Sequence, residues 1–201
     1  MTEYFNEQLQ VFQQSLASMD NELFEHMVRD ASAALQNNCC IVATGLGKNV
    51  PICEKFVGTM VSLGLRTLFM NTNSAVHGDL GCLHDGDMLI VLSKSGETEE
   101  SLRLVREIRK QERKITIWLI TYTRGSSLEA LCDHSLVMNL AHEGDAWNIV
   151  PTNSSTINLI VLQGLAVLTA QRMGITLEDF AKNHPGGAIG DALQKRSSGN
   201  V

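Results

Sequence analysis

Short apolar runs alternate with longer amphipathic segments along most of the chain. The runs are too short for helices, and most are rich in residues that favour extended structure. They predict strands at Cys39–Ala43, Thr67–Met70, Met88–Leu92, Ile115–Ile120 and Ser135–Leu140. Continuous apolar runs without polar alternation are typical of a parallel sheet that is buried on both faces.

The intervening segments carry apolar residues at helical spacing, as Leu23, Met27 and Ala31 illustrate. They predict helices at Glu7–Ala17, Asn21–Leu35, Lys48–Leu63, Glu99–Gln111 and Asn153–Met173. Short strands separated by helices require right-handed crossovers between parallel strands. The expected fold is therefore an α/β, three-layer α/β/α sandwich around a five-stranded parallel sheet.

The pattern contains no internal repeat, no low-complexity linker and no boundary to a second domain. We expect residues 1–36 to form an N-terminal helical segment that packs on the same domain. Residues 37–193 would form the main domain, and the polar residues 194–201 a flexible tail.

Composition excludes several classes of protein. The formal net charge of −6 argues against nucleic acid as a partner, because nucleic-acid binding needs a basic face. Five cysteines without paired spacing suggest neither a disulfide framework nor a zinc site, and we expect no metal and no cofactor. The first residues lack a signal peptide, and the apolar stretch 157–170 is too short to span a membrane. The sequence therefore predicts a cytoplasmic protein without a membrane partner.

The most informative segment is the turn that follows the predicted strand Met88–Leu92. There Ser93, Ser95, Gly96 and Thr98 directly precede a strongly helical segment. A helix N-terminus favours negative charge, and hydroxyl and backbone N–H groups can hold phosphate oxygens. The alternative is that the hydroxyls only cap the helix, as a lone Ser or Thr usually would. Three hydroxyls around one glycine favour a phosphate site.

Other polar segments follow the remaining strands. Gly45, Gly47 and Lys48 leave the first strand, His77 lies between the second and third, and Glu143 follows the fifth. In an open parallel sheet, ligands bind beyond the carboxyl ends of the strands at the switch in strand order. All of these segments can therefore face one pocket.

The pattern Ser93-x-Ser95-Gly96-x-Thr98 resembles the signature of sugar isomerase (SIS) domains, which bind phosphorylated sugars and have a Rossmann-like or flavodoxin-like fold. The segments Gly45–Lys48, Ala75–Gly81 and His184–Gly190 are similar to those of the D-arabinose 5-phosphate isomerase branch. The resemblance runs from about Asn38 to Leu193, nearly the whole folded chain.

This resemblance implies an aldose–ketose isomerase that interconverts D-ribulose 5-phosphate and D-arabinose 5-phosphate. The product would supply the octulosonate (Kdo) sugar of lipopolysaccharide. It also implies that the hydroxyls of Ser93, Ser95 and Thr98 hold the phosphate. The family places His184 in the active site of a neighbouring subunit, so a homotetramer is expected. The CBS modules common in this branch are not expected here.

Moving a carbonyl between adjacent carbons requires a base, a donor near the enediol oxygen and a proton shuttle. Lys48, His77, Glu100, Glu143 and His184 are residues of the right types. Each also has an ordinary alternative: any Glu is favourable in the first turn of a helix, as Glu100 is. The sequence leaves open whether Glu100 or Glu143 abstracts the proton and which histidine assists ring opening. His84, His134 and His142 are expected to have structural roles.

Two departures from the branch flank the expected sugar site. Asn49 and Val50 replace a small Ser-Gly pair, and the usual Cys-Pro near Glu143 is missing. An isomerase acting on another phosphosugar therefore remains an alternative. The other is a non-catalytic phosphosugar-binding regulatory module, against which the presence of Glu100, Glu143 and His184 argues.

Overall fold

The computed structural model describes residues 1–197. Its centre is a five-stranded sheet with the strand order β2-β1-β3-β4-β5. Every neighbouring pair of strands is parallel. The strands are β1 (Ile41–Gly45), β2 (Thr67–Asn71), β3 (Met88–Leu92), β4 (Thr116–Thr121) and β5 (His134–Val137). The predicted α/β sandwich with five parallel strands is thereby confirmed.

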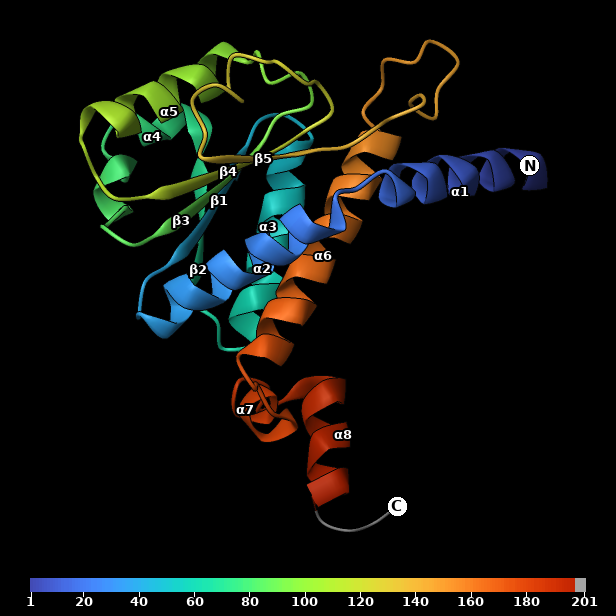
Figure 1. The fold of residues 1–201 in the computed structure, drawn as a ribbon. Helices are drawn as coiled ribbons and strands as arrows, with labels where there is room; N and C mark the ends of the chain where they lie inside the picture. Colours follow the sequence, from blue (N-terminus) through green and yellow to red (C-terminus); the bar gives the residue numbers. More distant parts are fainter. Residues whose placement is uncertain (198–201) are drawn as a thin grey trace.

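Helices cover both faces of this sheet (Figure 1). They are α1 (Thr2–Ala17), α2 (Asn21–Gln36), α3 (Asn49–Ser62), α4 (Thr72–Ala75), the 3-10 helix η1 (Asp79–Cys82), α5 (Glu99–Lys110), α6 (Asn153–Arg172), α7 (Leu177–Lys182) and α8 (Gly187–Ser197). Side chains of α2, α3 and α6 pack on one face, and those of α4 and α5 pack on the other. Helix α1 extends away from the sheet beside the start of α6.

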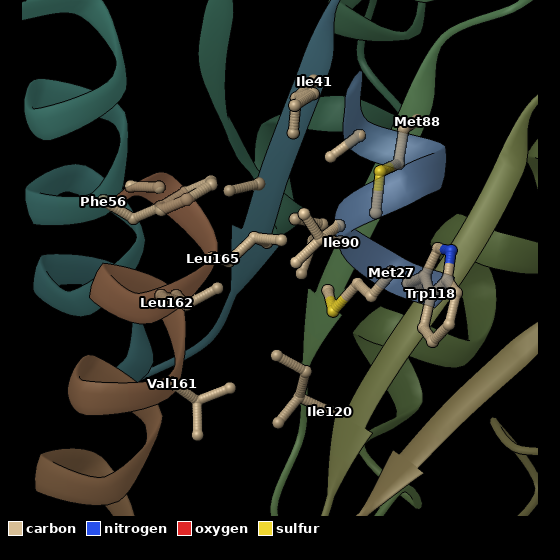
Figure 2. Packing of buried hydrophobic residues seen from close by; sticks show 14 of the residues in the cluster. Met27, Ile41, Phe56, Met88, Ile90, Trp118, Ile120, Val161, Leu162 and Leu165 are labelled. Carbon is tan, nitrogen blue, oxygen red and sulfur yellow. The ribbon is translucent and has the colours of Figure 1, made fainter. Parts of the chain in front are cut away.

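Alternate residues of each strand supply the two halves of the core. In β3, Met88 and Ile90 face α2, α3 and α6, whereas Leu89 and Val91 face α5. Figure 2 shows Leu162 and Leu165 of α6 packed toward Ile90. All five residues of β3 are buried, and burial on both faces explains why this strand is apolar at every position.

The first strand lies two residues later than predicted, at Ile41–Gly45 instead of Cys39–Ala43. The backbone N–H of Cys40 donates to the carboxylate of Asp87 at 2.7 Å, so a side chain satisfies that amide outside the strand ladder. At the other end, Thr44 pairs with Val91 and Gly45 with Leu92 of β3. The hydrogen-bonded pairing of the backbone determines where β1 begins and ends, and the hydrophobic pattern of the sequence does not contain this information.

Helix α6 is long and apolar enough to cross a membrane, yet 56% of its most apolar window is buried inside the protein. It passes along the face of the sheet that α2 and α3 also cover, and it leads to α7 and α8 at its far end (Figure 1). Helix α8 continues past the predicted domain limit at Leu193 to Ser197, with Lys195 and Arg196 in its last turn. Basic residues are favourable at the C-terminus of a helix, and residues 194–197, which the sequence assigned to the tail, continue α8. Residues 198–201 of that tail lie outside the described residues.

Candidate active site

The switch in strand order falls between β1 and β3, which are neighbours in the sheet. From β1 the chain enters α3 on one face, and from β3 it enters α5 on the other. The two connections diverge and leave a crevice at the carboxyl ends of these strands. A hollow of about 390 Å³ occupies it. It is lined by Leu46, Asn49, Leu92, Ser93, Lys94, Ser95, Thr98 and Thr123.

The turn after β3 is held by its own hydroxyls. The buried Ser93 Oγ accepts a hydrogen bond from the backbone N–H of Gly96 at 3.1 Å. Gly96 has a φ of 67°, and a Cβ there would lie 2.1 Å from Ser126 Oγ. Only glycine fits this position without moving the chain. Gly96 therefore shapes the predicted phosphate turn from within and does not line the hollow.

Thr98 is the residue before the first turn of α5. Its hydroxyl lies 3.3 Å from the Ser93 hydroxyl and makes no capping hydrogen bond to the helix that it precedes. The residues Ser93, Ser95 and Thr98 all line the hollow beside the N-terminus of α5. This arrangement favours the phosphate interpretation over simple helix capping, because the hydroxyls and the helix dipole converge on one space.

The exit of β1 forms the other wall. A Cβ on Gly45 would lie 2.8 Å from Asn49 Cβ, so glycine allows the first turn of α3 to approach the strand. Asn49 donates to the carbonyl of Leu92 at 3.3 Å and accepts from the Asn158 amide at 3.1 Å. Asn49, which departs from the pattern of the arabinose 5-phosphate isomerase branch, thus lines the hollow and is held in place by Asn158 of α6.

Lys48 and Gly47 border the hollow without lining it. Lys48 is exposed at the start of α3, between the lining residues Leu46 and Asn49. Gly47 has a φ of 57°, which turns the chain between β1 and α3. Both lie at the carboxyl end of the sheet, as the sequence predicts.

Behind the turn, the ammonium group of Lys94 lies 2.6 Å from the carboxylate of Glu143. The Glu143 side chain is fully buried, whereas that of Lys94 is 42% exposed. The carboxylate also accepts from Ser154 Oγ at 2.5 Å and from the backbone N–H groups of Thr152 and Ser154 at 3.0 Å each. Glu143 thus caps the start of α6.

These contacts determine the ionisation of Glu143. Burial alone would raise the pKa of this carboxyl group, but the hydrogen bonds from Lys94, Ser154 and Thr152 lower the pKa to about 2. A carboxylate offers about four acceptor positions, and here they are taken. Glu143 is therefore a firmly ionised anchor with little capacity to accept a proton from a substrate.

Two further predicted residues lie on exposed positions at this end of the sheet. Glu100 is exposed in the first turn of α5, two residues after Thr98. His77 is exposed between α4 and η1, in the connection that leaves β2. Glu100 is near the phosphate turn by sequence, while His77 follows the edge strand beside β1.

His184 lies elsewhere in the protomer. Its imidazole stacks on Phe180 with ring centroids 3.9 Å apart, and its Nδ1 lies 2.8 Å from the carbonyl of Phe180. The adjacent Asn183 donates to the carbonyl of Ser62, at the end of α3 remote from Lys48. The 14 residues of α3 rise about 21 Å. His184 is therefore not part of the crevice within its own protomer.

Sequence reasoning missed Lys94, Thr123 and Asn158. Thr123 follows β4 at the carboxyl end, so the rule that placed the other segments there could have found it. Lys94 was visible inside the turn, but its partner Glu143 lies 49 residues away. The buried Asn158, which also accepts from Tyr122 at 3.0 Å, appeared only as a polar interruption of a core helix.

The chain is similar in sequence and in fold to known proteins. The SIS domain family profile matches residues 34–168. The arabinose 5-phosphate isomerase KdsD of Yersinia pestis is 33% identical over 190 residues, which cover 94% of this chain and 57% of that protein. KdsD of Salmonella typhi is 31% identical over 192 residues, or 96% of this chain and 58% of that protein. The chain thus spans a little over half the length of these relatives.

A solved structure of an Escherichia coli CFT073 protein in complex with arabinose 5-phosphate superimposes with a TM-score of 0.82. The two chains are 28% identical, and the match covers 92% of this chain and 95% of the other. The fold is therefore shared with a protein that binds a ligand of the class expected from the sequence.

Proposed function

The chain belongs to the SIS domain family, and on that premise we propose that it is an aldose–ketose isomerase that interconverts D-ribulose 5-phosphate and D-arabinose 5-phosphate. The product would enter the Kdo pathway of lipopolysaccharide synthesis in the cytoplasm. The reaction needs no cofactor, because it only moves protons between adjacent carbon and oxygen atoms.

One observation carries the proposal. The hydroxyls of Ser93, Ser95 and Thr98 converge beside the N-terminus of α5, in a hollow of about 390 Å³. In this orientation they can donate to phosphate oxygens while the helix dipole stabilises the negative charge. The sugar would then extend toward Asn49 and the start of α3.

The two candidate bases differ in their surroundings. A base that must accept a proton near neutral pH works poorly with a pKa of about 2, which is the value for Glu143. Glu143 would also have to release Lys94 or Ser154 first. Glu100 is exposed at the same helix terminus that would hold the phosphate. We therefore assign proton abstraction to Glu100 and the positioning of Lys94 and of the start of α6 to Glu143.

The remaining groups would act on oxygen atoms. Lys48 would contact the substrate oxygens from the start of α3, and His77 would assist proton transfer during ring opening. His184 would enter the site of a neighbouring subunit in a homotetramer. Every side chain of α7 is at least partly exposed, and Leu177 and Ile189 near His184 are 53% and 52% exposed. These exposed apolar side chains are available for contact with another copy.

The test is turnover of D-arabinose 5-phosphate by the purified protein, with unphosphorylated D-arabinose as the matched substrate. We expect turnover of the phosphorylated sugar only. Glu100→Gln should lower kcat by about 10² to 10⁴-fold with a small change in KM. Glu99→Gln is the matched control, because Glu99 is an exposed carboxylate on the same helical turn. An unchanged kcat in Glu100→Gln would contradict its role as base.

The same experiment separates the alternatives. Turnover of a different phosphosugar, with D-arabinose 5-phosphate inert, would assign another substrate to the same crevice. Asn49 is the reason to consider this outcome, because it departs from the branch pattern and lines the hollow where the sugar would lie. Tight binding of phosphosugars without any turnover would identify a regulatory binding module.

A further inference from the structure

A second cluster of chemically capable side chains lies on α2 and the outer strands, outside the crevice. His26 and Asp30 are one helical turn apart on α2, and His134 is the first residue of the edge strand β5. Residues four apart on a helix project from the same face. The fold brings this face against the amino end of β5, although 104 residues separate Asp30 from His134.

The three side chains converge on one carboxylate. His26 Nε2 lies 3.3 Å from Asp30 Oδ1, and His134 Nε2 lies 3.9 Å from Asp30 Oδ2. One ligand atom from each residue can be chosen so that all three lie within 4.8 Å of one another. Each imidazole therefore directs the same ring nitrogen into a common space.

Neighbouring groups fix these orientations. The indole N–H of the buried Trp118 donates to Asp30 Oδ2 at 2.9 Å. The Trp118 ring also lies against both imidazoles, with centroids 5.5 Å from His26 and 4.5 Å from His134. A hydrogen bond that orients a ligating carboxylate is a regular feature of metal sites.

We propose that His26, Asp30 and His134 bind one divalent transition-metal ion of the zinc class. Two imidazole nitrogens and a carboxylate oxygen form the donor set that suits such ions. With neutral imidazoles the cluster carries one negative charge, which complements a divalent cation. The side chains of His26, His134 and Asp30 are 37%, 31% and 25% exposed, so an ion can enter and water can complete its coordination.

His26 Nε2 and Asp30 Oδ1, 3.3 Å apart, already suit two metal–ligand bonds of about 2.0–2.2 Å in tetrahedral geometry, whereas the nitrogen of His134 must move closer to them. Small rotations about the torsion angles of these partly exposed side chains can bring the ligand atoms about 1 Å closer together. The ion would then join α2 to the edge strand β5. Because His134 begins β5, this site lies at the amino end of the strand, whereas the sugar crevice lies at the carboxyl ends of β1 and β3.

The experiment is calorimetric titration of chelator-treated protein with Zn²⁺, together with thermal unfolding at zero and saturating Zn²⁺. We expect one ion per protomer at this site and a higher Tm with Zn²⁺, since a ligand of the folded state stabilises it. His26→Gln and His134→Gln should each weaken binding by at least about 10-fold and remove most of the Tm increase.

Two variants make the test specific. Asp30→Asn keeps an oxygen that can accept from Trp118 but loses the charge, so it should fold normally and lose Zn²⁺ binding. His84→Gln is the matched control, because His84 is a more exposed histidine near Asp87, in a separate hollow with Cys39, Cys40 and Cys82. Equal Zn²⁺ affinity in the wild type, Asp30→Asn and His26→Gln would overturn the proposal, and so would a wild type that binds no Zn²⁺. Loss of binding only in His84→Gln would locate the ion at the cysteine-containing hollow and would equally overturn it.

Discussion

The ammonium group of Lys94 contacts the buried carboxylate of Glu143 at 2.6 Å and thereby joins the phosphate turn to the start of α6. Lys94 comes from the same turn as Ser93 and Ser95, and Glu143 caps the helix that fixes Asn49 through Asn158. The two walls of the crevice are therefore connected through a single ion pair and its hydrogen bonds.

Replacement of Glu143 by Gln should destabilise the protein at pH 7 by about 3 kcal/mol, because Lys94 and the start of α6 lose their anionic partner. Urea unfolding measures this change. Glu107→Gln is the matched control, since Glu107 forms an exposed pair with Lys110 at 2.7 Å, and such pairs contribute at most about 1 kcal/mol. Equal effects of the two substitutions would refute the anchoring role.

The ionisation of Glu143 also predicts a pH dependence. Its pKa of about 2 is below the ordinary value of 4.5, so its stabilisation is present above about pH 4.5 and is lost as the pH falls toward 2. The amount is about 3 kcal/mol. Unfolding free energies measured from pH 6 down to pH 3 should decline less steeply in Glu143→Gln than in the wild type. Parallel declines would mean that other carboxylates account for the acid sensitivity.

Thr98 and Thr176 should respond in opposite ways to truncation. Thr98→Ala should weaken phosphosugar binding about 10-fold and leave the Tm nearly unchanged, because its hydroxyl faces Ser93 and the hollow. Thr176 forms a capping box with Asp179 at the start of α7, so Thr176→Ala should cost about 1 kcal/mol. Calorimetric titration and thermal unfolding of both variants decide this. A large stability loss in Thr98→Ala would restore the simple capping interpretation.

Alanine substitutions at Gly96 and Gly125 should distinguish the cost of backbone strain from the cost of a steric clash. Both have a positive φ, of 67° and 72°, but a Cβ would meet Ser126 Oγ at 2.1 Å only in the case of Gly96. Gly125→Ala should cost about 1 kcal/mol from conformational strain alone. Gly96→Ala should cost about 2–4 kcal/mol and abolish phosphosugar binding, since the turn must open. Chemical unfolding measures the loss of stability in each variant. Similar losses in both would show that the chain relieves the close contact at Gly96 at little cost.

A shared active site predicts complementation between inactive variants. His184→Ala and Glu100→Gln should each be nearly inactive alone. After the subunits are mixed and allowed to exchange, random assembly gives intact sites amounting to about one quarter of the wild-type number. The measurement is turnover before and after exchange. Absence of recovery in verified mixed assemblies would exclude a shared site.

The sequence predicted most elements because local patterns determine them. The strand Met88–Leu92 was located to the residue, and the turn after it was predicted to hold phosphate because hydroxyls, glycine and a helix start are adjacent in sequence. In the structure that turn lines the hollow. The switch in strand order predicted that the segments after the strands gather at one end of the sheet, but it did not predict the individual side-chain contacts between them. Glu143 meets Lys94, and His134 meets Asp30, only after the sheet has assembled.

Helix α6 has a consequence for any assembly of this chain. It begins at the residues that hold Glu143, and at its 1.5 Å rise per residue its 20 residues carry the chain about 30 Å to the segment bearing His184. If His184 completes the site of a neighbour, each α6 is a rod with one sugar site at either end. The sites would then be coupled through α6. A substrate that displaces the start of α6 in one subunit would also move the His184 of that subunit, and this His184 would lie in the site of the neighbouring subunit.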